Sequence, residues 1–337
     1  MRLAPILTCA AILALAMLVS LSLGKYPLPV GEVAWFLVHR LGGGGGGITA
    51  QRLAVLDNIV LAVRLPRILT AVLVGAGLSI SGAAYQAMFA NPLVSPDLLG
   101  VLGGASFGAV LAMVFLKSWF AVQACTFLGG LAAVGAAVLI ARIYRIDSAL
   151  MLILGGIISA AFFTSLVSIV KFVADPETQL PAITFWLMGD LSLADRALVL
   201  RAGLPILAGI AGLVLSARSL NVLSMGEEEA RALGVNVQRV RWGVILCATL
   251  VSTLTVVLAG AVGWVGLIIP HITRMLLGPD NETLLPASAL IGASYLLAVD
   301  NVSRLSFTSE VPIGISTSLV GIPFFLLVLR NARKGWS

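Results

Sequence analysis

The chain has 337 residues, of which 59% are hydrophobic and 11% charged, and its formal net charge is +6. A soluble domain carries about 25% charged residues and the strands of a transmembrane barrel alternate apolar with polar residues, so the composition excludes the first class and argues against the second. Apolar runs of about 20 residues predict an all-α polytopic membrane protein, whose basic loops face anionic lipid and not nucleic acid.

The first apolar run covers residues 5–24 and is predicted to be a membrane span. A basic start, here Arg2, followed by an apolar stretch is also typical of a secretory signal peptide. The run is long for a signal peptide and no A-x-A cleavage site closes it, so the sequence favours a span.

Residues 25–63 are predicted to be a loop outside the membrane. Pro27, Pro29 and the six glycines at 42–47 indicate irregular chain, and a run of six glycines is typical of a flexible linker. Apolar residues between positions 33 and 41 predict a short surface helix before the glycines.

Nine further apolar runs bring the predicted number of spans to ten, and an even number places both termini on one side of the membrane. The runs cover approximately residues 65–89, 98–116, 119–141, 149–173, 197–216, 242–259, 261–277, 284–303 and 311–330. Because Gly263, Gly266 and Pro270 interrupt one run, we expect that span to be kinked or short.

Small residues within the spans predict close packing of helices, since lipid supplies no hydrophobic drive for helix association. They are Gly75, Gly77, Ser79, Ser81 and Gly82 in one span and the G-x-x-x-G pair Gly104 and Gly108 in the next. Basic residues flanking the spans divide almost equally between the two sides. Their densest clusters, 218–241 and 330–334, favour a cytoplasmic position.

The sequence contains no recognisable catalytic or metal-binding pattern. Its two histidines, His39 and His271, belong to no metal-ligand cluster, and the phosphate-binding motif G-x-x-x-x-G-K-[ST] does not occur. We therefore expect no catalytic residue, metal or cofactor in this chain. Ionisable residues are scarce within the spans, which argues against an ion-coupled carrier. That class and a purely structural membrane scaffold stay as alternatives.

A polar segment at 224–235, SMGEEEARALGV, predicts a short helix outside the membrane. Ser224 and Glu227 have the spacing of a capping box, and Gly234 stands where a helix-ending glycine is expected. Glu227 and Arg231 are four residues apart, in the favourable order for an ion pair. A helix of two to three turns does not persist alone, so it must pack on its own bundle or dock a soluble partner.

Five long motifs follow one another along nearly the whole chain. They read RLPRILTAVLVGAGLSISGAAYQAMFANPLVSPDLLGV at 64–101, GEEEARALGVNV at 226–237, GWVGLIIPHITR at 263–274, LLPASALIGASYLLAVDNVSR at 284–304 and EVPIGISTSLVGIPFF at 310–325. With these motifs the chain resembles the cobalamin and iron-siderophore (FecCD-type) permeases, the transmembrane subunits of type II ABC importers. The six-glycine run is the clearest departure from the family.

The resemblance implies a single permease domain over residues 1–337, in a homodimer with ten spans per subunit and cytoplasmic termini in the bacterial inner membrane. It implies two cytoplasmic ATPase subunits that bind ATP with Mg²⁺, and a periplasmic or extracellular binding protein that delivers a metal chelate. Ferric siderophore is the first expected cargo, and haem, cobalamin and molybdate stay open.

The resemblance also implies where the contacts lie. Residues 217–241 would be the cytoplasmic coupling segment, with ATPase contacts at Gly226, Glu227, Glu228, Ala230, Leu233 and Gly234. The binding protein would dock on Arg64, Arg67 and Arg304, which could instead simply anchor helix ends. A cytoplasmic gate would lie at Asp147 and Ser148, and the substrate path along 149–173 and 311–330. The stretch 175–188, DPETQLPAITFWLM, looks like an outer half-helix, closer to iron-chelate than to cobalamin permeases.

Overall fold

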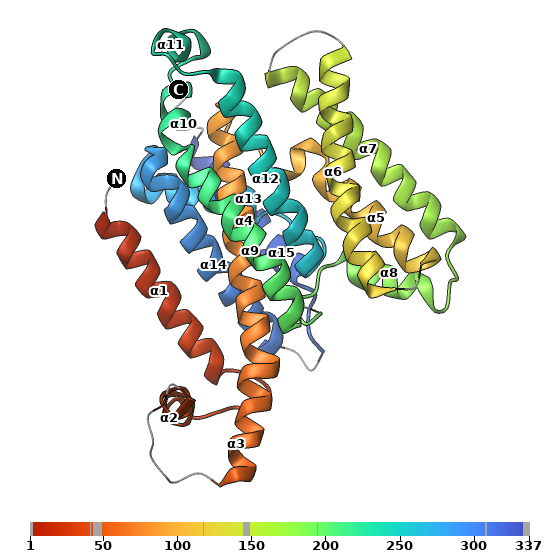
Figure 1. Cartoon of the computed structure of the whole chain (residues 1–337), viewed down its shortest axis with the longest axis vertical. Coiled ribbons are helices and arrows are strands. Elements are labelled where there is room, and N and C mark those ends of the chain that lie inside the picture. Colours follow the sequence, from red (N-terminus) through yellow and green to blue (C-terminus); the bar gives the residue numbers. More distant parts are fainter. Residues whose placement is uncertain are drawn as a thin grey trace.

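The computed structural model describes residues 3–40, 42, 49–116, 118–143, 149–193, 195–306 and 309–332. All regular structure within these ranges is helical (Figure 1). Each of the ten predicted spans corresponds to a helix: α1 (Leu3–Ser22), α4 (Leu65–Met88), α5 (Val101–Phe115), α6 (Trp119–Ile143), α7 (Ala149–Val173), α9 (Arg196–Leu215), α12 (Val237–Ala259), α13 (Val265–Leu277), α14 (Asn281–Ser306) and α15 (Ile313–Ala332). The all-α membrane fold is therefore confirmed.

The spans differ in length. Seven helices in the described part of the chain are long and apolar enough to cross a membrane, one of them the stretch that contains α4. The helices α5 and α13 are shorter, and α15 is apolar over residues 313–326. The expectation that the run 261–277 is short is confirmed, because α13 begins only at Val265.

α4 lies inside the bundle and packs against α9, α12, α13 and α14. Its small residues permit very close approach. A Cβ atom added to Gly75 would lie 2.3 Å from the carbonyl oxygen of Gly292 in α14, and one on Gly82 would lie 1.8 Å from that of Gly266 in α13. α5 contacts α6 equally closely at Gly104. The predicted packing through small residues is confirmed at these three positions.

The segment 25–63 contains more helix than expected. α2 (Val30–Arg40) confirms the predicted surface helix. α3 (Ala50–Leu56) and the π-helix η1 (Asp57–Arg64) then run directly into α4, so one helix extends over Ala50–Met88. The prediction of loop at 50–63 is wrong. Of the six glycines, those at 43–47 lie outside the described residues.

Local polar contacts account for the early start of this long helix. The Thr49 hydroxyl accepts a hydrogen bond from the Arg52 backbone N–H and caps α3. The guanidinium of Arg52 binds Glu32 of α2 at 2.6 Å, and Arg40 of α2 binds Asp57 with an Nε–Oδ1 distance of 3.0 Å. The hydrogen bond from Arg52 lowers the pKa of the Glu32 carboxyl. These pairs hold α2 beside the first turns of the long helix.

Short helices mark the two ends of the bundle. α11 (Glu227–Ala232) lies at one end with α10 (Ala217–Leu223) and the start of α12. α2, α3 and α8 (Gln179–Leu187) lie toward the opposite end (Figure 1). α8 confirms the half-helix predicted within 175–188. α1 begins, and α6 ends, toward the α11 end.

The core has two main parts. One part surrounds the first half of α4 and includes α1, α2 and α14. The other surrounds its second half and includes α10, α11 and α12. Short helices at both ends are thus packed into the same apolar core that holds the spans together.

Candidate functional site

The polar segment forms α11, a helix of six residues. Gly226 is its N-cap residue and has a φ of 128°, a conformation that favours glycine. Ser224 does not cap α11, so the predicted capping box is wrong. Ser224 is instead the C-cap residue of α10, and its hydroxyl donates to the Asn221 carbonyl at 2.7 Å. Because Ser224 belongs to the end of α10, α11 starts only at Glu227, and its six residues are fewer than the predicted two to three turns.

The predicted end of α11 is confirmed. Gly234 has a φ of 81°, and its N–H donates to the Arg231 carbonyl at 3.0 Å. The Val235 N–H donates to the Ala230 carbonyl at 2.9 Å. This pair of bonds is a Schellman motif, which closes the helix and turns the chain toward α12.

Glu227 joins α11 to the rest of the chain. It pairs with Arg231 at 2.7 Å, as its spacing predicts, and also with Arg241 of α12. The Arg241 side chain is only 9% exposed, so this carboxylate partner offsets the cost of burying its charge. Sequence reasoning missed Arg241, although a basic residue one turn into a span that follows an acidic segment was a usable signal.

The residues predicted to contact an ATPase divide into two sets. Ala230 is fully buried in the core beside α10 and α12, Glu227 is engaged within the chain, and Gly226 is half-buried as the N-cap of α11. Glu228, Leu233 and Gly234 are exposed. Only this second set can meet a partner without a rearrangement of the chain.

α10 is fastened to the start of α14. The Asn221 amide donates to Asp280 at 2.7 Å and accepts from the Asn281 backbone N–H at 2.8 Å. Arg218 adds an ion pair with Glu282 at 2.7 Å. The bond from Asn221 lowers the pKa of the Asp280 carboxyl. The segment before α11 is thus fixed to a long helix of the bundle.

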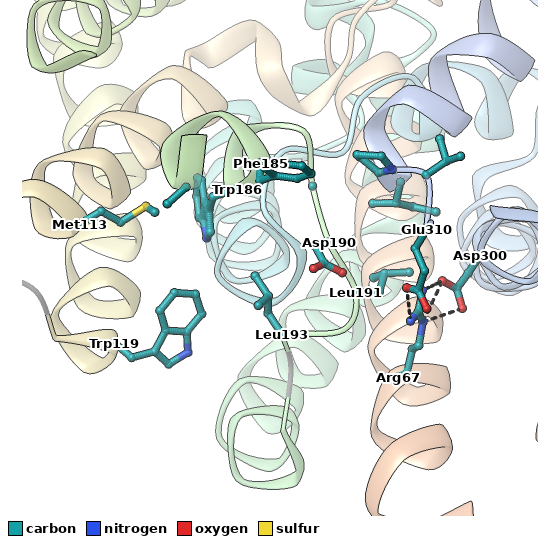
Figure 2. A pocket seen from close by; sticks show the side chains of 15 residues that line it. Arg67, Met113, Trp119, Phe185, Trp186, Asp190, Leu191, Leu193, Asp300 and Glu310 are labelled. Carbon is teal, nitrogen blue, oxygen red and sulfur yellow. Dashed lines mark hydrogen bonds and ion pairs between the residues drawn. The ribbon is translucent and has the colours of Figure 1, made fainter. Parts of the chain in front are cut away.

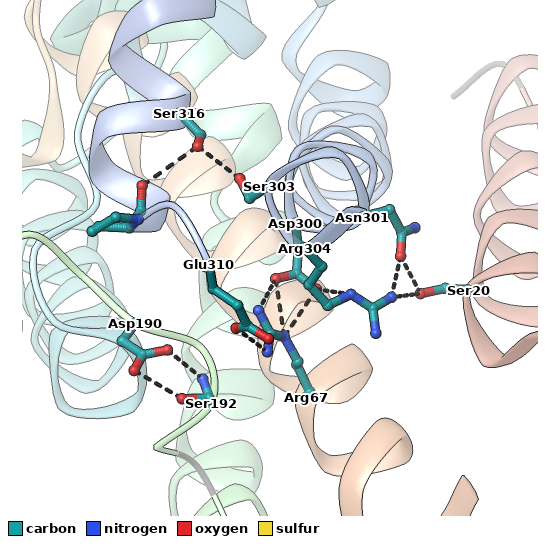
Figure 3. Close-up of polar contacts among 11 residues, drawn as sticks. Ser20, Arg67, Asp190, Ser192, Asp300, Asn301, Ser303, Arg304, Glu310 and Ser316 are labelled. Carbon is teal, nitrogen blue, oxygen red and sulfur yellow. Dashed lines mark hydrogen bonds and ion pairs between the residues drawn. The ribbon is translucent and has the colours of Figure 1, made fainter. Parts of the chain in front are cut away.

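At the opposite end, Arg67 lies in a network of ion pairs (Figure 3). Its guanidinium contacts Asp300 of α14 at 2.8 Å and Glu310 at 2.7 Å. The exposed fraction of the side chain is 13% for Arg67 and 2% for Asp300. Arg304 lies 3.6 Å from the same Asp300 carboxylate and donates to Asn301. The network joins α4 and α14 to the segment before α15.

Arg64 is buried as well and donates to the backbone carbonyls of Leu21 and Tyr26. The three predicted docking residues, Arg64, Arg67 and Arg304, are therefore not free surface charges. A desolvated guanidinium needs partners, and here the chain itself supplies them. Their role in docking stays a prediction.

A cavity of about 340 Å³ opens beside Arg67 (Figure 2). Carboxylates lie on one side of it, and the aromatic side chains Trp119, Phe185 and Trp186 lie on the other. Asp190 accepts bonds from the backbone N–H and the hydroxyl of Ser192, at 2.7 and 2.8 Å. The cavity is thus lined by both apolar and charged groups.

Backbone hydrogen bonds join the segment 188–190, part of which lines this cavity, to the start of α15. The N–H groups of Ile313 and Gly314 donate to the carbonyls of Gly189 and Met188, at 3.1 and 3.0 Å. The Asp190 N–H donates to the carbonyl of Ala259 at 2.9 Å. α8, α12 and α15 therefore meet at one junction.

The predicted gate residues, Asp147 and Ser148, lie outside the described residues. Within the described ranges, no group of three or more His, Cys, Asp or Glu side chains is placed to hold a metal ion. That the chain holds no metal or cofactor stays a prediction.

Comparisons with known proteins agree on one family. The model of the FecCD transport family matches residues 12–331. The molybdate import system permease protein MolB of Haemophilus influenzae is 39% identical over 325 residues, which cover 96% of this chain and 94% of that protein. A probable iron chelatin transport system permease protein of Helicobacter pylori is 38% identical over 283 residues, or 84% of this chain and 86% of that protein. A solved metal-chelate type ABC transporter, in an inward-facing conformation, has a TM-score of 0.86 and 37% identity, and covers 98% of this chain and 100% of that one.

Proposed function

Because this chain belongs to the FecCD transport family and is thus the permease of a type II ABC importer, we propose that it carries a metal chelate, with ferric siderophore as the first candidate, across the bacterial inner membrane. In this proposal the chain acts as a homodimer with two cytoplasmic ATPase subunits and a soluble binding protein. The ATPases bind ATP with Mg²⁺, and the binding protein brings the chelate from outside.

The exposed face of α7 supports a bulky chelate as the cargo. Ile157, Phe162 and Phe172 expose more than half of their surface on this helix. Thr164 and Ser168 add exposed hydroxyl groups, and no charged residue lies within 149–170. A face without fixed charge has little hold on a small bare ion, whereas it can pass a large ligand shell. We propose that this face lines the path between two subunits, together with α15.

We propose that α11 faces the cytoplasm and contacts the ATPase through Glu228, Leu233 and Gly234. The exposed position of these residues and the fixed geometry of α10 and α11 support this role. The buried Ala230 and the paired Glu227 would then position α11 and not touch the partner.

We further propose that the network around Arg67 faces outward, toward the binding protein. Docking on Arg64, Arg67 or Arg304 would require their internal partners to be exchanged for carboxylates of the binding protein. Glu310 is the member of the network best placed for such an exchange, since its side chain is 39% exposed.

Molybdate is the second candidate cargo, because the MolB relative aligns over nearly the whole chain. Relatives named for hemin and cobalamin transport keep those two chelates open as well.

Uptake by proteoliposomes that contain the chain with its cognate ATPase and binding protein would test the proposal. The probes are a ⁵⁵Fe-labelled siderophore, haemin, cobalamin and ⁹⁹Mo-molybdate, each with and without internal ATP. ATP-dependent uptake of the siderophore is the expected result. ATP-dependent uptake of molybdate alone would transfer the assignment to the second candidate, and uptake driven by an ion gradient without ATP would overturn the importer proposal.

A further inference from the structure

The start of α12 contacts two other helices through adjacent side chains. Arg241 pairs with Glu227 of α11, and Trp242 packs under Arg142 near the end of α6. Successive residues of an α-helix point about 100° apart, so neighbouring positions can face two different elements. The start of α12 and the end of α6 both lie toward the end of the bundle where α11 sits (Figure 1).

The first contact ties α12 to the helix proposed to receive the ATPase. Glu227 is the first residue of α11, and its carboxylate bridges Arg231 in the same helix and Arg241 in α12. Because Arg241 is buried, separating this pair would leave a desolvated charge without its partner. A displacement of α11 is therefore opposed unless the start of α12 moves with it.

The second contact ties α12 to α6. The Arg142 guanidinium carbon lies 5.1 Å from the centre of the Trp242 ring, within the range of a cation–π interaction. Arg142 precedes the end of α6 at Ile143 by one residue. The contact therefore joins the start of α12 to the last turn of α6.

α6 in turn is packed closely on α7. The Ser159 hydroxyl of α7 donates to the Ala133 carbonyl of α6 at 2.7 Å. A Cβ atom on Gly155 of α7 would lie only 2.4 Å from the carbonyl oxygen of Ala137 in α6. Such backbone contact leaves no room for the two helices to shift independently in this region.

We propose that Arg241 and Trp242 form a mechanical relay, which transmits movement of α11 through α6 to α7. This inference rests on the proposed function, in which α11 meets the ATPase and α7 lines the path. The two residues are positioning residues: neither touches ATP nor the cargo. The relay requires that the two contacts persist together while the permease changes conformation, and that removing either one weakens the coupling of α7 to the ATPase.

Distance measurements between spin labels on α7 and α1 would test the relay. Leu150 and Leu7 are both 65% exposed and serve as label sites, after replacement of the native Cys9, Cys125 and Cys247 by alanine. The permease is assembled with its ATPase in nanodiscs, and the distance distribution is recorded without nucleotide and with ATP and vanadate. In the labelled permease without further substitutions, we expect ATP and vanadate to produce a second distance population.

Two variants remove the cation–π contact, and two matched controls keep it. Trp242→Leu and Arg142→Gln should lower the nucleotide-induced ratio of the two populations by about two- to fivefold, the range expected for loss of one such contact. Trp242→Phe and Arg142→Lys should retain most of the response. ATPase binding should be unchanged in all four, since none of these residues belongs to the exposed face of α11.

Exchange of the charges tests the other contact. Arg241→Glu should suppress the response of α7, and Arg241→Glu combined with Glu227→Arg should restore part of it. If the double variant is as unresponsive as Arg241→Glu alone, the ion pair does not transmit the movement and the relay is overturned.

The outcomes separate the relay from the function on which it rests. If ATP moves α7 in the parent protein and equally in Trp242→Leu and Arg142→Gln, the relay is overturned and the importer proposal stands. If the parent protein neither binds the ATPase nor responds to nucleotide, the proposed function itself fails.

Discussion

Glu227 and Glu228 are neighbours with different surroundings. Glu227 holds two arginines of its own chain, whereas Glu228 faces solvent. Sequence alone placed both in the first turn of a helix and could not separate their roles, because Arg241 approaches Glu227 only in the folded protein.

Changing the two glutamates one at a time should separate the position of α11 from its contact surface. Glu227→Gln should lower the stability of the permease by about 1–3 kcal/mol, because Arg241 loses its charged partner. Glu228→Gln should leave stability unchanged and weaken ATPase binding. Thermal melting in detergent and titration with the ATPase are the measurements, with Glu229→Gln as the matched exposed control. Equal melting temperatures for Glu227→Gln and the parent would contradict the first expectation.

The two acidic partners of Arg67 should also contribute unequally to the stability of the permease. Asp300→Asn leaves two buried arginines short of charge and should cost about 3–5 kcal/mol. Glu310→Gln should cost under about 1 kcal/mol, because this side chain is partly in solvent. Thermal melting of both variants in one detergent gives the comparison. A loss for Glu310→Gln as large as that for Asp300→Asn would show that the network is not organised around Asp300.

At the scale of elements, long apolar helices were predictable because each corresponds to one continuous apolar run in the sequence. A helix was found for each of the ten predicted spans, with ends shifted by a few residues, and seven of these helices are long and apolar enough to cross a membrane. The helix at 50–63 was missed although Leu53, Leu56 and Val60 recur at helical spacing and pack into the core, because the prolines and glycines before it indicated a loop and its start depends on Thr49 and on ion pairs with α2. Contacts between distant elements were equally hidden: Arg67 and Asp300 are 233 residues apart in the chain.

The contact of α4 with α13 gives an element-scale prediction. Gly82→Ala places a methyl group on the carbonyl of Gly266 and should cost about 1–3 kcal/mol through overpacking. Gly135→Ala in α6 is the matched control, because nothing lies within 4 Å of a Cβ atom at that position. Melting temperatures should fall for the first variant and stay level or rise for the second. The same fall in both would mean that glycine matters here through the backbone and not through helix contact.

At the scale of the whole molecule, the two ends of the bundle are built from different short helices. One end bears α10 and α11, and the other bears α2, α3 and the cavity beside Arg67 (Figures 1 and 2). The motifs of the chain predicted this division through the family resemblance, but composition and charge did not, since basic residues are spread over both sides.

Single cysteines should report which end faces the cytoplasm. Val30 in α2 and Leu233 next to α11 are 67% and 63% exposed, so a cysteine at either place is accessible to a reagent. In spheroplasts, which have an intact inner membrane, a membrane-impermeant maleimide should label Val30→Cys and should not label Leu233→Cys. Permeabilised membranes from cells that lack the ATPase should label both. The reverse pattern would invert the proposed orientation.

The continuous helix from Ala50 to Met88 is longer than the apolar layer of a bilayer is thick. At about 1.5 Å per residue it is about 58 Å long, roughly 28 Å more than the apolar thickness of a bilayer. Part of this helix must therefore extend beyond the apolar layer, and α2 braces its first turns, whereas α8 has only nine residues. A soluble protein that docked at this end, as proposed, would meet a surface formed by helices of different length.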